Sequence, residues 1–459
     1  MSLTQRIQSA PMSRTQYAVV ALCVAMNMLD GFDVLALAFS STAIADEWQL
    51  SGGQLGVLLS SALLGMAIGS ALVSQVADVI GRRTTILACG ALITVGMALS
   101  AAATGYEMLL AVRVVTGVAI GTLQACLNVL VSEYSSARHR PTAISFYTAG
   151  QPIGGTLGGI LAGVLLSSLG WRSVFAFGAV ATGVLVLVVW RVLPESMDYL
   201  ISRRPPRALE RLNVILARIG HDPVAELPAS VAVRSTRARW SAVLVGRAGL
   251  VTLALGLAFF MLMAGFYFAN SWTPQLVVLN GFLPADGVQA GVMFSLGGIA
   301  GSLLFGPVAS RLGVRPTLVA AFALAGAAFA GYAASMGSLA VAFTLAAALG
   351  AMTSAAMAGM FSVGPMYYDG ATRATGVGLI IGLGRVGAIV SPIVAGRLLD
   401  TGWEPGQLYY LFVIPMLVGA AAIALLRRVP VATAEPSATE SDRSGQVVGA
   451  TPTIPGGQS

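Results

Sequence analysis

Two carboxylates lie three residues apart inside the first long apolar stretch of the chain, in the run Asp30-Gly31-Phe32-Asp33. Residues three apart share one face of a helix, and Asn27 extends that face by one turn. Because charges within a bilayer are costly, those that persist mark ion or substrate pathways. We therefore predict that Asp30 and Asp33 take up and release a proton. The alternative is that they hydrogen-bond neighbouring helices or cap a helix break at Gly31.

Two arginines, Arg113 and Arg385, also lie inside apolar stretches. A guanidinium keeps its charge in a protein, so each needs an anionic partner. For Arg113 the predicted partner is Asp30 or Asp33, either to tune proton binding or as a purely structural ion pair. Arg385 lies among glycines, with no acidic residue in the segment 375–395. It suits a substrate carboxylate held by two parallel hydrogen bonds, unless it only braces another helix.

Other polar and aromatic side chains in apolar stretches are candidates to line a cavity. The segment 259–272 is rich in aromatic residues, which suits stacking on a flat ring, although many such residues face lipid. Both histidines, His139 and His221, fall outside the apolar stretches, so a proton path would use carboxylates. The predicted lining consists of Gln124, Asn128, Gln151, Phe266, Tyr267 and Asn270.

The composition excludes most functions of soluble proteins. The 459 residues are 56% hydrophobic and 10% charged, with a mean hydropathy of +0.82, well beyond the apolar content of soluble domains. All 26 basic residues are arginine, so the phosphate-binding loop that requires lysine is absent and ATP bound to this chain would not drive it. The three cysteines lie in apolar stretches without metal-ligand spacing. We expect no cofactor, no metal, no nucleic-acid partner and no enzymatic activity.

Twelve apolar stretches approach the roughly 20 residues that a helix needs to cross a bilayer. Six precede and six follow a polar segment. We predict an all-α membrane protein of twelve transmembrane helices in two six-helix bundles, 1–193 and 249–428, with a cytoplasmic linker, 194–248, and a disordered cytoplasmic tail, 429–459. The predicted spans are 17–39, 55–76, 84–103, 108–130, 143–166, 173–193, 250–272, 290–308, 317–334, 338–359, 375–395 and 409–426.

The two halves resemble each other, which predicts pseudo-symmetric bundles. The run ADVIGRR at 77–83 follows the second span, and ASRLGVR at 309–315 follows the eighth. A second correspondence puts Gln151 of the fifth span opposite Arg385 of the eleventh. Duplicated halves around a midplane site are typical of transporters that rock between two open states.

Arginines outside the spans predict the orientation. They cluster in the linker and in loops on the same side, whereas only Arg172 and Arg397 fall on the other side. The positive-inside rule therefore predicts that both termini and the linker are cytoplasmic. The first apolar run has membrane-spanning length, so we expect a retained helix and not a cleaved signal peptide. The predicted location is the bacterial inner membrane.

The loop after the second span resembles the pattern G-x-x-x-D-[RK]-x-G-R-[RK] of the major facilitator superfamily. Ser74 and Val79 depart from the pattern. The resemblance implies a latch for the cytoplasmic gate. Arg113 with Gly117 fits the R-x-x-x-G element of the fourth helix, which the superfamily links to proton coupling, and Glu133 is a partner for the basic cluster. The loop residues that match are Asp78, Gly81, Arg82 and Arg83.

Asp-Gly-Phe-Asp at 30–33 and Gly-Arg-Val-Gly at 384–387 together resemble the aromatic acid:proton symporter family of that superfamily. Its members import benzoate-like, hydroxybenzoate, gentisate and related acids. The resemblance implies uptake of a small aromatic carboxylate with protons by alternating access, and we expect a monomer in the lipid bilayer. The family's functional positions match here at Asp30, Asp33, Asp78, Arg113, Glu133, Arg373 and Arg385.

Two rival functions are weaker. Gln151 stands where drug antiporters of the superfamily have a glycine, which counts against a proton antiporter that exports drugs or other organic anions. A membrane-embedded enzyme or sensor would need a nucleophile with its base, a metal-ligand cluster or a large output domain, and the sequence offers none of these.

Overall fold

The structure, a computed structural model, describes residues 10–228, 243–335, 337–368 and 372–426. The chain divides into two units, Met1–Leu426 and Arg427–Ser459. The second unit, and with it the predicted disordered tail, lies outside the described residues. Every regular element in the described ranges is a helix, and twelve helical stretches are long and apolar enough to cross a membrane. The predicted all-α fold with twelve spans is confirmed.

Six spans form the first half of the chain. The second span is not one regular helix, because it passes through a π-helical turn and a 3-10 turn before its last α-helical turn. Such turns loosen the regular hydrogen-bond ladder near a loop. The elements are α2 (Arg14–Trp48), α3 (Gly52–Ile68), η1 (Gly69–Val73), η2 (Ser74–Val76), α4 (Ala77–Ile80), α5 (Arg82–Ala101), α6 (Tyr106–Tyr134), α7 (Arg140–Leu169) and α8 (Trp171–Val192).

Two short helices, α9 (Met197–Arg203) and α10 (Ala208–Arg218), lie in the segment for which the sequence predicts only a linker. Leu212, Ile215 and Leu216 are buried along one face of α10. Their spacing is that of an amphipathic helix that gains its stability from packing.

The second half of the chain contains the other six spans. Its last span is broken at Phe412, between a short helix and a longer one. The elements are α12 (Gly246–Leu279), α13 (Pro284–Leu312), α14 (Val314–Ala334), α15 (Leu339–Val363), η3 (Gly364–Tyr367), α16 (Arg373–Asp400), α17 (Pro405–Leu411) and α18 (Val413–Leu425).

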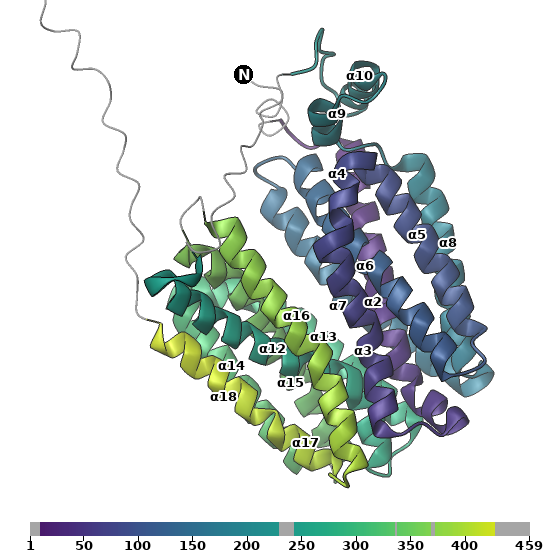
Figure 1. The fold of residues 1–459 in the computed structure, drawn as a ribbon, viewed down its shortest axis with the longest axis vertical. Coiled ribbons are helices and arrows are strands. Elements are labelled where there is room, and N and C mark those ends of the chain that lie inside the picture. Colours follow the sequence, from purple (N-terminus) through teal and green to yellow (C-terminus); the bar gives the residue numbers. More distant parts are fainter. Residues whose placement is uncertain (1–9, 229–242, 336, 369–371, 427–459) are drawn as a thin grey trace, which may run out of the picture. The chain divides into compact units, whose positions relative to one another are not determined.

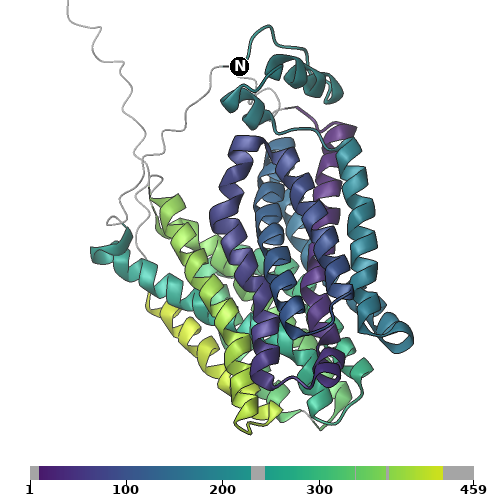
Figure 2. The ribbon, with the colours of Figure 1, turned by 45° about the vertical axis from the view of Figure 1, so that its right-hand side comes forward.

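The same packing recurs in the two halves, which we call the N-terminal bundle (α2 to α8) and the C-terminal bundle (α12 to α18) (Figures 1 and 2). In the first, α2 lies against α7 and α3 against α6; in the second, α12 lies against α16 and α13 against α15. Glycines permit the close approach, since a Cβ on Gly121 would overlap the backbone of Met66, and one on Gly301 that of Ala351. The predicted pair of pseudo-symmetric bundles is confirmed.

The repeated loop motif has the same local structure in both bundles. Gly81 has φ 100° and ψ 145°, and Gly313 has φ 91° and ψ 148°. Two residues after each glycine, an arginine donates hydrogen bonds to carbonyls at the end of the bundle's last span. Arg83 bonds to the Leu193 and Trp190 carbonyls, and Arg315 to those of Ile423 and Ala424.

The two bundles contact each other at one end. We call the end that carries α9 and α10 the linker end, and the opposite end the far end. Each hydrogen bond between the bundles in the described ranges lies in the far half of the spans. The donors are Ser41 and Thr42 to Gln275, Gly52 and Gly53 to Asp400, and Ser60 to the Ile389 carbonyl.

Candidate functional site

Arg113 and Asp33 form a fully buried ion pair between α6 and α2. Arg113 donates from Nη1 to the Asp33 Oδ1 at 2.8 Å and from Nη2 to the Asp33 carbonyl at 3.2 Å. Its guanidinium also lies 5.9 Å from the centre of the Phe175 ring. The sequence predicts either Asp30 or Asp33 as the partner of Arg113, and in the structure the partner is Asp33. The Asp33 Oδ2 and the Arg113 Nε have no hydrogen-bond partner among the described residues.

Asp30 has a different neighbour from Asp33, although the two share a helix face. Gln124 of α6 donates to the Asp30 Oδ2 at 2.5 Å, while the Asp30 Oδ1 is buried and has no partner within the described part of the chain. The Gln124 carbonyl accepts from the Tyr147 hydroxyl at 3.1 Å. The Tyr147 carbonyl in turn accepts from the Asn27 amide at 2.6 Å. These bonds connect α2, α6 and α7 around one unpaired carboxylate oxygen.

Gly31 places α2 directly against α7. A Cβ at this position would overlap the Gln151 carbonyl. Helix α2 runs without interruption from Arg14 to Trp48, so the alternative that the carboxylates cap a break at Gly31 is wrong. Gln151 is half-buried.

Arg385 lies in α16 of the other bundle and is half-buried. The glycines beside it bring α16 close to α12, because a Cβ on Gly387 would overlap the Phe260 carbonyl. No hydrogen bond or ion pair joins Arg385 to another described residue. Its charge is within electrostatic range of the Asp30 carboxylate and the Tyr267 hydroxyl. Arg385, a cation of the C-terminal bundle without a partner among the described residues, thus lies within electrostatic range of Asp30, the incompletely hydrogen-bonded carboxylate of the N-terminal bundle.

The aromatic residues of α12 divide into two groups. Phe266 and Tyr267 are half-buried and meet edge to face at 5.2 Å, and Phe266 also contacts the Phe294 ring at 5.6 Å. Phe268 instead stacks on Phe412 at 4.0 Å inside the C-terminal bundle. Tyr267 of the first group is within electrostatic range of Arg385.

The two predicted amides differ in exposure. Asn270, one turn after Phe266, is half-buried. Asn128, one turn from Gln124 toward the linker end, is exposed. Neither amide side chain has a hydrogen-bond partner within the described ranges, so both retain free donors and acceptors.

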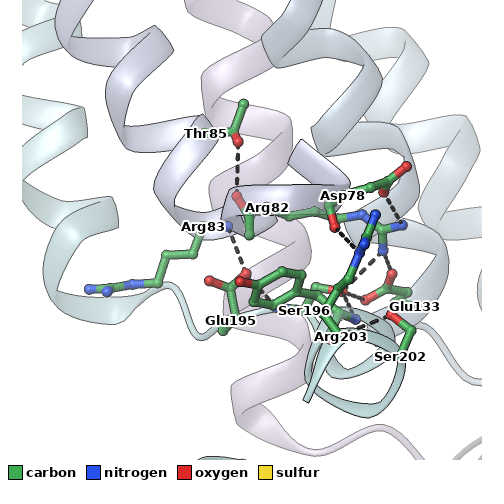
Figure 3. A network of polar contacts seen from close by, with 11 residues as sticks. Asp78, Arg82, Arg83, Thr85, Glu133, Glu195, Ser196, Ser202 and Arg203 are labelled. Carbon is green, nitrogen blue, oxygen red and sulfur yellow. Dashed lines mark hydrogen bonds and ion pairs between the residues drawn. The ribbon is translucent and has the colours of Figure 1, made fainter. Parts of the chain in front are cut away.

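The loop residues with predicted gating roles form a polar cluster at the linker end (Figure 3). Arg82 makes an ion pair with Glu133 and donates to the Ser196 hydroxyl at 3.0 Å. The Ser196 hydroxyl also donates to Glu133 at 2.7 Å. Asp78 is 3.6 Å from Arg82, and its side chain is 65% exposed. The Arg203 Nε donates to the Asp78 carbonyl at 2.9 Å.

Glu195 organises the other half of this cluster. Its carboxylate accepts from the backbone N–H groups of Arg83 and Ser196, both at 2.9 Å. Its carbonyl accepts from the Tyr134 hydroxyl at 2.7 Å. The cluster therefore joins the N-terminal bundle to the start of the linker segment. Arg373 begins α16, but its side chain lies outside the described residues.

Several participants were not predicted as site residues. Tyr147 precedes Gln151 by one helical turn, and that spacing of polar groups inside an apolar span was the available signal. Glu195 and Ser196 had a weaker signal, because a serine before an acidic residue is a common helix start. Ser196 is the N-cap of α9 and accepts from the Tyr199 N–H at 3.1 Å.

Two symmetric helical bundles that bring intramembrane charges together are the architecture of a secondary transporter. The family model described as Major Facilitator Superfamily matches residues 20–301 and 284–455. The chain belongs to the major facilitator superfamily, whose members are membrane transporters and not enzymes.

Similar proteins agree with this assignment. The chain is 30% identical to the 4-hydroxybenzoate transporter PcaK of Pseudomonas aeruginosa over 424 residues, 91% of this chain and 94% of the relative. It is also 30% identical to the gallate transporter of Pseudomonas putida, over 93% of this chain and 96% of that protein. These relatives confirm the predicted resemblance to the aromatic acid symporters. The fold matches an inward open structure of the xylose transporter XylE from E. coli, with a TM-score of 0.73 at 15% identity over 90% of this chain and 96% of that one.

Proposed function

We propose that this protein imports aromatic carboxylates such as benzoate, hydroxybenzoates or gentisate together with protons, by alternating access. One observation carries the proposal: Arg385 is a half-buried cation without a hydrogen-bond or ion-pair partner among the described residues, and its charge is within electrostatic range of Asp30 in the opposite bundle. The relatives named for 4-hydroxybenzoate and gallate support an aromatic acid as the anion.

In this proposal Arg385 holds the substrate carboxylate through two parallel hydrogen bonds. Phe266 and Tyr267 contact the ring, because they form an edge-to-face aromatic pair and Tyr267 is within electrostatic range of Arg385. The polar groups Gln124, Asn128, Gln151 and Asn270 are available for ring substituents. None of their side-chain amide groups except that of Gln124 is used in a hydrogen bond to another described residue.

Asp30 is the proposed site of proton exchange, and the pair of Asp33 with Arg113 sets its electrostatic surroundings. The positive charge of Arg385 and the negative charge of an ionised Asp30 attract each other across the boundary between the bundles. A substrate anion on Arg385 would neutralise this effect, so that binding of the acid and binding of the proton support each other. This reciprocity is the requirement for symport.

The distribution of arginine supports a cytoplasmic linker end and cytoplasmic termini. With that orientation, the contacts at the far end make this conformation inward-facing. We propose that residues 1–193 and 249–428 rock against each other, and that Asp78, Gly81, Arg82, Arg83, Glu133 and Arg373 regulate closure of the cytoplasmic side. The exposed Asp78 carboxylate is free to change partners during that closure.

The test is uptake of a panel of radiolabelled aromatic acids into cells that express the protein, with and without a protonophore. We expect protonophore-sensitive uptake of at least one hydroxylated benzoate. Arg385→Ala should abolish it, whereas Arg311→Ala, which removes an exposed arginine from α13, should not. Asp30→Asn should stop accumulation but leave exchange of labelled for unlabelled acid across the membrane.

Right-side-out vesicles decide the direction of transport. Substrate movement outward, against an inward proton gradient, would favour the export alternative. If no aromatic acid enters cells that contain the protein in their membrane, the proposed substrate class is wrong. If Arg385→Ala leaves the apparent affinity unchanged, its carboxylate-binding role is wrong.

A further inference from the structure

Asp400 connects the two bundles at the far end by binding the N-terminus of α3. Its Oδ1 accepts from the Gly52 N–H and its Oδ2 from the Gly53 N–H, both at 2.7 Å. Asp400 is the last residue of α16, in the C-terminal bundle, whereas the two glycines begin α3 in the N-terminal bundle. A carboxylate at this position is also favoured by the partial positive charge of the helix start.

The local sequence of α3 leaves these two N–H groups available. Ser51 and Gln54 form a capping box, in which the Ser51 hydroxyl accepts from the Gln54 N–H at 3.2 Å and the Gln54 side chain accepts from the Ser51 N–H at 3.0 Å. The N–H groups of Gly52 and Gly53 have no acceptor inside the helix. They can bond to water or to a group from outside, and in this conformation Asp400 supplies that group.

The glycines allow the backbones of α3 and α16 to come close enough for this contact. A Cβ on Gly52 would lie 2.6 Å from the Gly396 carbonyl oxygen, and a Cβ on Gly396 would overlap the Gly52 carbonyl. One turn further, Gly56 lies against the Pro392 carbonyl in the same way. Helices α3 and α16 can therefore cross this closely only with small residues at the positions near the Asp400 carboxylate.

We propose that Asp400 is a latch that stabilises the closed far end and is released each time that end opens. This inference relies on the alternating-access part of the proposed function. When the bundles separate, water can replace both partners of the latch, so the latch changes the relative populations of the two states without preventing the transition. It acts beyond the substrate site, because Asp400 and Arg385 are fifteen residues apart on α16, about 22 Å along a helix.

The latch can be tested without any substrate. Ser295 of α13 is buried next to Gly155 of α7, at a second contact between the bundles, and a Ser295→Cys variant would report opening of the far end. The three native cysteines are buried, so background labelling should be low. The readout is the rate at which a membrane-impermeant maleimide labels this cysteine in intact cells. A Glu107→Cys variant, exposed at the far end, checks that this end faces the reagent.

Asp400→Asn should increase the labelling rate of the reporter about three to ten times, because it removes the charge and one of two charge-assisted hydrogen bonds. The substitution keeps the shape of an exposed side chain, so the fold should be retained. Asp286→Asn is the matched control. Asp286 also caps a helix start at the far end, with the Leu283 N–H at 3.0 Å, but within a single bundle. It should leave the labelling rate unchanged.

Gly396→Ala tests the same latch without altering a charge. The added methyl group should separate α3 from α16 and increase labelling in the same direction as Asp400→Asn. If both variants label at the rate of the parent protein, the latch is overturned. If Asp286→Asn accelerates labelling as much as Asp400→Asn, the effect is a general one of surface charge, and the proposal is equally wrong. Because labelling needs no aromatic acid, these outcomes are separate from a failure to detect uptake.

Discussion

The ion pair of Asp33 and Arg113 removes two charges from water, and both side chains are almost completely buried. Burial of both charges costs several kcal/mol each, which the attraction between them offsets only when the geometry is good. The pair makes two hydrogen bonds but leaves the Asp33 Oδ2 and the Arg113 Nε without partners among the described residues. A pair of this kind contributes little net stability, yet the loss of either partner is severe.

Asp33→Ala should therefore lower the free energy of unfolding by about 3–5 kcal/mol, because Arg113 is left as an unpaired buried charge. The double variant Asp33→Ala with Arg113→Leu should recover most of this loss. Thermal unfolding of the detergent-purified proteins measures the comparison, and uptake assays accompany it. If the double variant is no more stable than Asp33→Ala alone, the unpaired charge is not the cause. If it still transports with protons, the pair has only a structural role.

For single residues, the sequence predicts which charged side chains have a role better than it predicts the partners of those side chains. Intramembrane Asp30, Asp33 and Arg113 stand out because nothing in an apolar span explains them. Their spacing could not decide which aspartate meets Arg113, since both are on one face of α2. Tyr147 escaped prediction because its contribution is a hydroxyl and a backbone carbonyl, and these contacts depend on how α7 packs against α6 and α2.

The turns at Gly81 and Gly313 illustrate how an element depends on one residue type. Both glycines have backbone angles that side chains with a Cβ rarely adopt. Each turn reverses the chain tightly enough for the next helix to begin directly, at Arg82 and at Val314. The surroundings differ, because a Cβ on Gly81 would lie 2.7 Å from the Glu195 Oε2, whereas one on Gly313 would meet nothing closer than Pro316 at 3.5 Å.

Gly313→Ala should cost about 1–3 kcal/mol through backbone strain alone. Gly81→Ala should cost more, because the methyl group also displaces Glu195 from the N–H groups that it binds. Hydrogen exchange should then accelerate in α9, residues 197–203, only in the Gly81 variant. Melting temperatures and amide exchange of the two purified variants check both expectations. Equal exchange in α9 would mean that Glu195 does not hold this helix in place.

The spans are predictable as elements, since hydrophobic length alone identifies them. Their ends are not, because helices continue beyond the apolar core: α2 runs over 14–48, whereas the apolar stretch covers 17–39. The short helices α9 and α10 were missed because an amphipathic segment of seven or eleven residues is not stable by itself. The spacing of Leu212, Ile215 and Leu216 marks one apolar face of α10, but it does not show which surface that face packs against.

The molecule as a whole has a conformation that its sequence does not specify. The same sequence must be compatible with a closed and with an open conformation of the far end. The similarity between the two halves of the sequence predicts two bundles, but it does not predict where the bundles contact each other. In this conformation the bundles meet in the far half through hydrogen bonds and through glycine contacts such as that of Gly159 with Val292. The open question is whether the two bundles must move apart at these contacts for transport to occur.

A disulfide between the two bundles at the far end tests whether they must separate there. A Cβ on Gly159 would lie 2.5 Å from the Val292 Cγ2, so cysteines at these positions of α7 and α13 have Cβ atoms near the roughly 4 Å that a disulfide requires. Gly90 and Val186 have the same 2.5 Å relation, but both lie in the N-terminal bundle, on α5 and α8. The two cysteine pairs therefore differ mainly in whether they connect two bundles or one.

Oxidation of the Gly159→Cys, Val292→Cys protein should reduce transport at least about tenfold, and a reductant should restore it, because the closed far end can no longer open. The Gly90→Cys, Val186→Cys protein should transport equally well when oxidised and reduced, since each bundle moves as a unit. Uptake before and after reduction, with crosslinking verified on gels, makes the measurement. Undiminished transport by the oxidised α7 to α13 pair would mean that the far end does not separate there. Inhibition by the α5 to α8 pair would mean that the N-terminal bundle itself must deform.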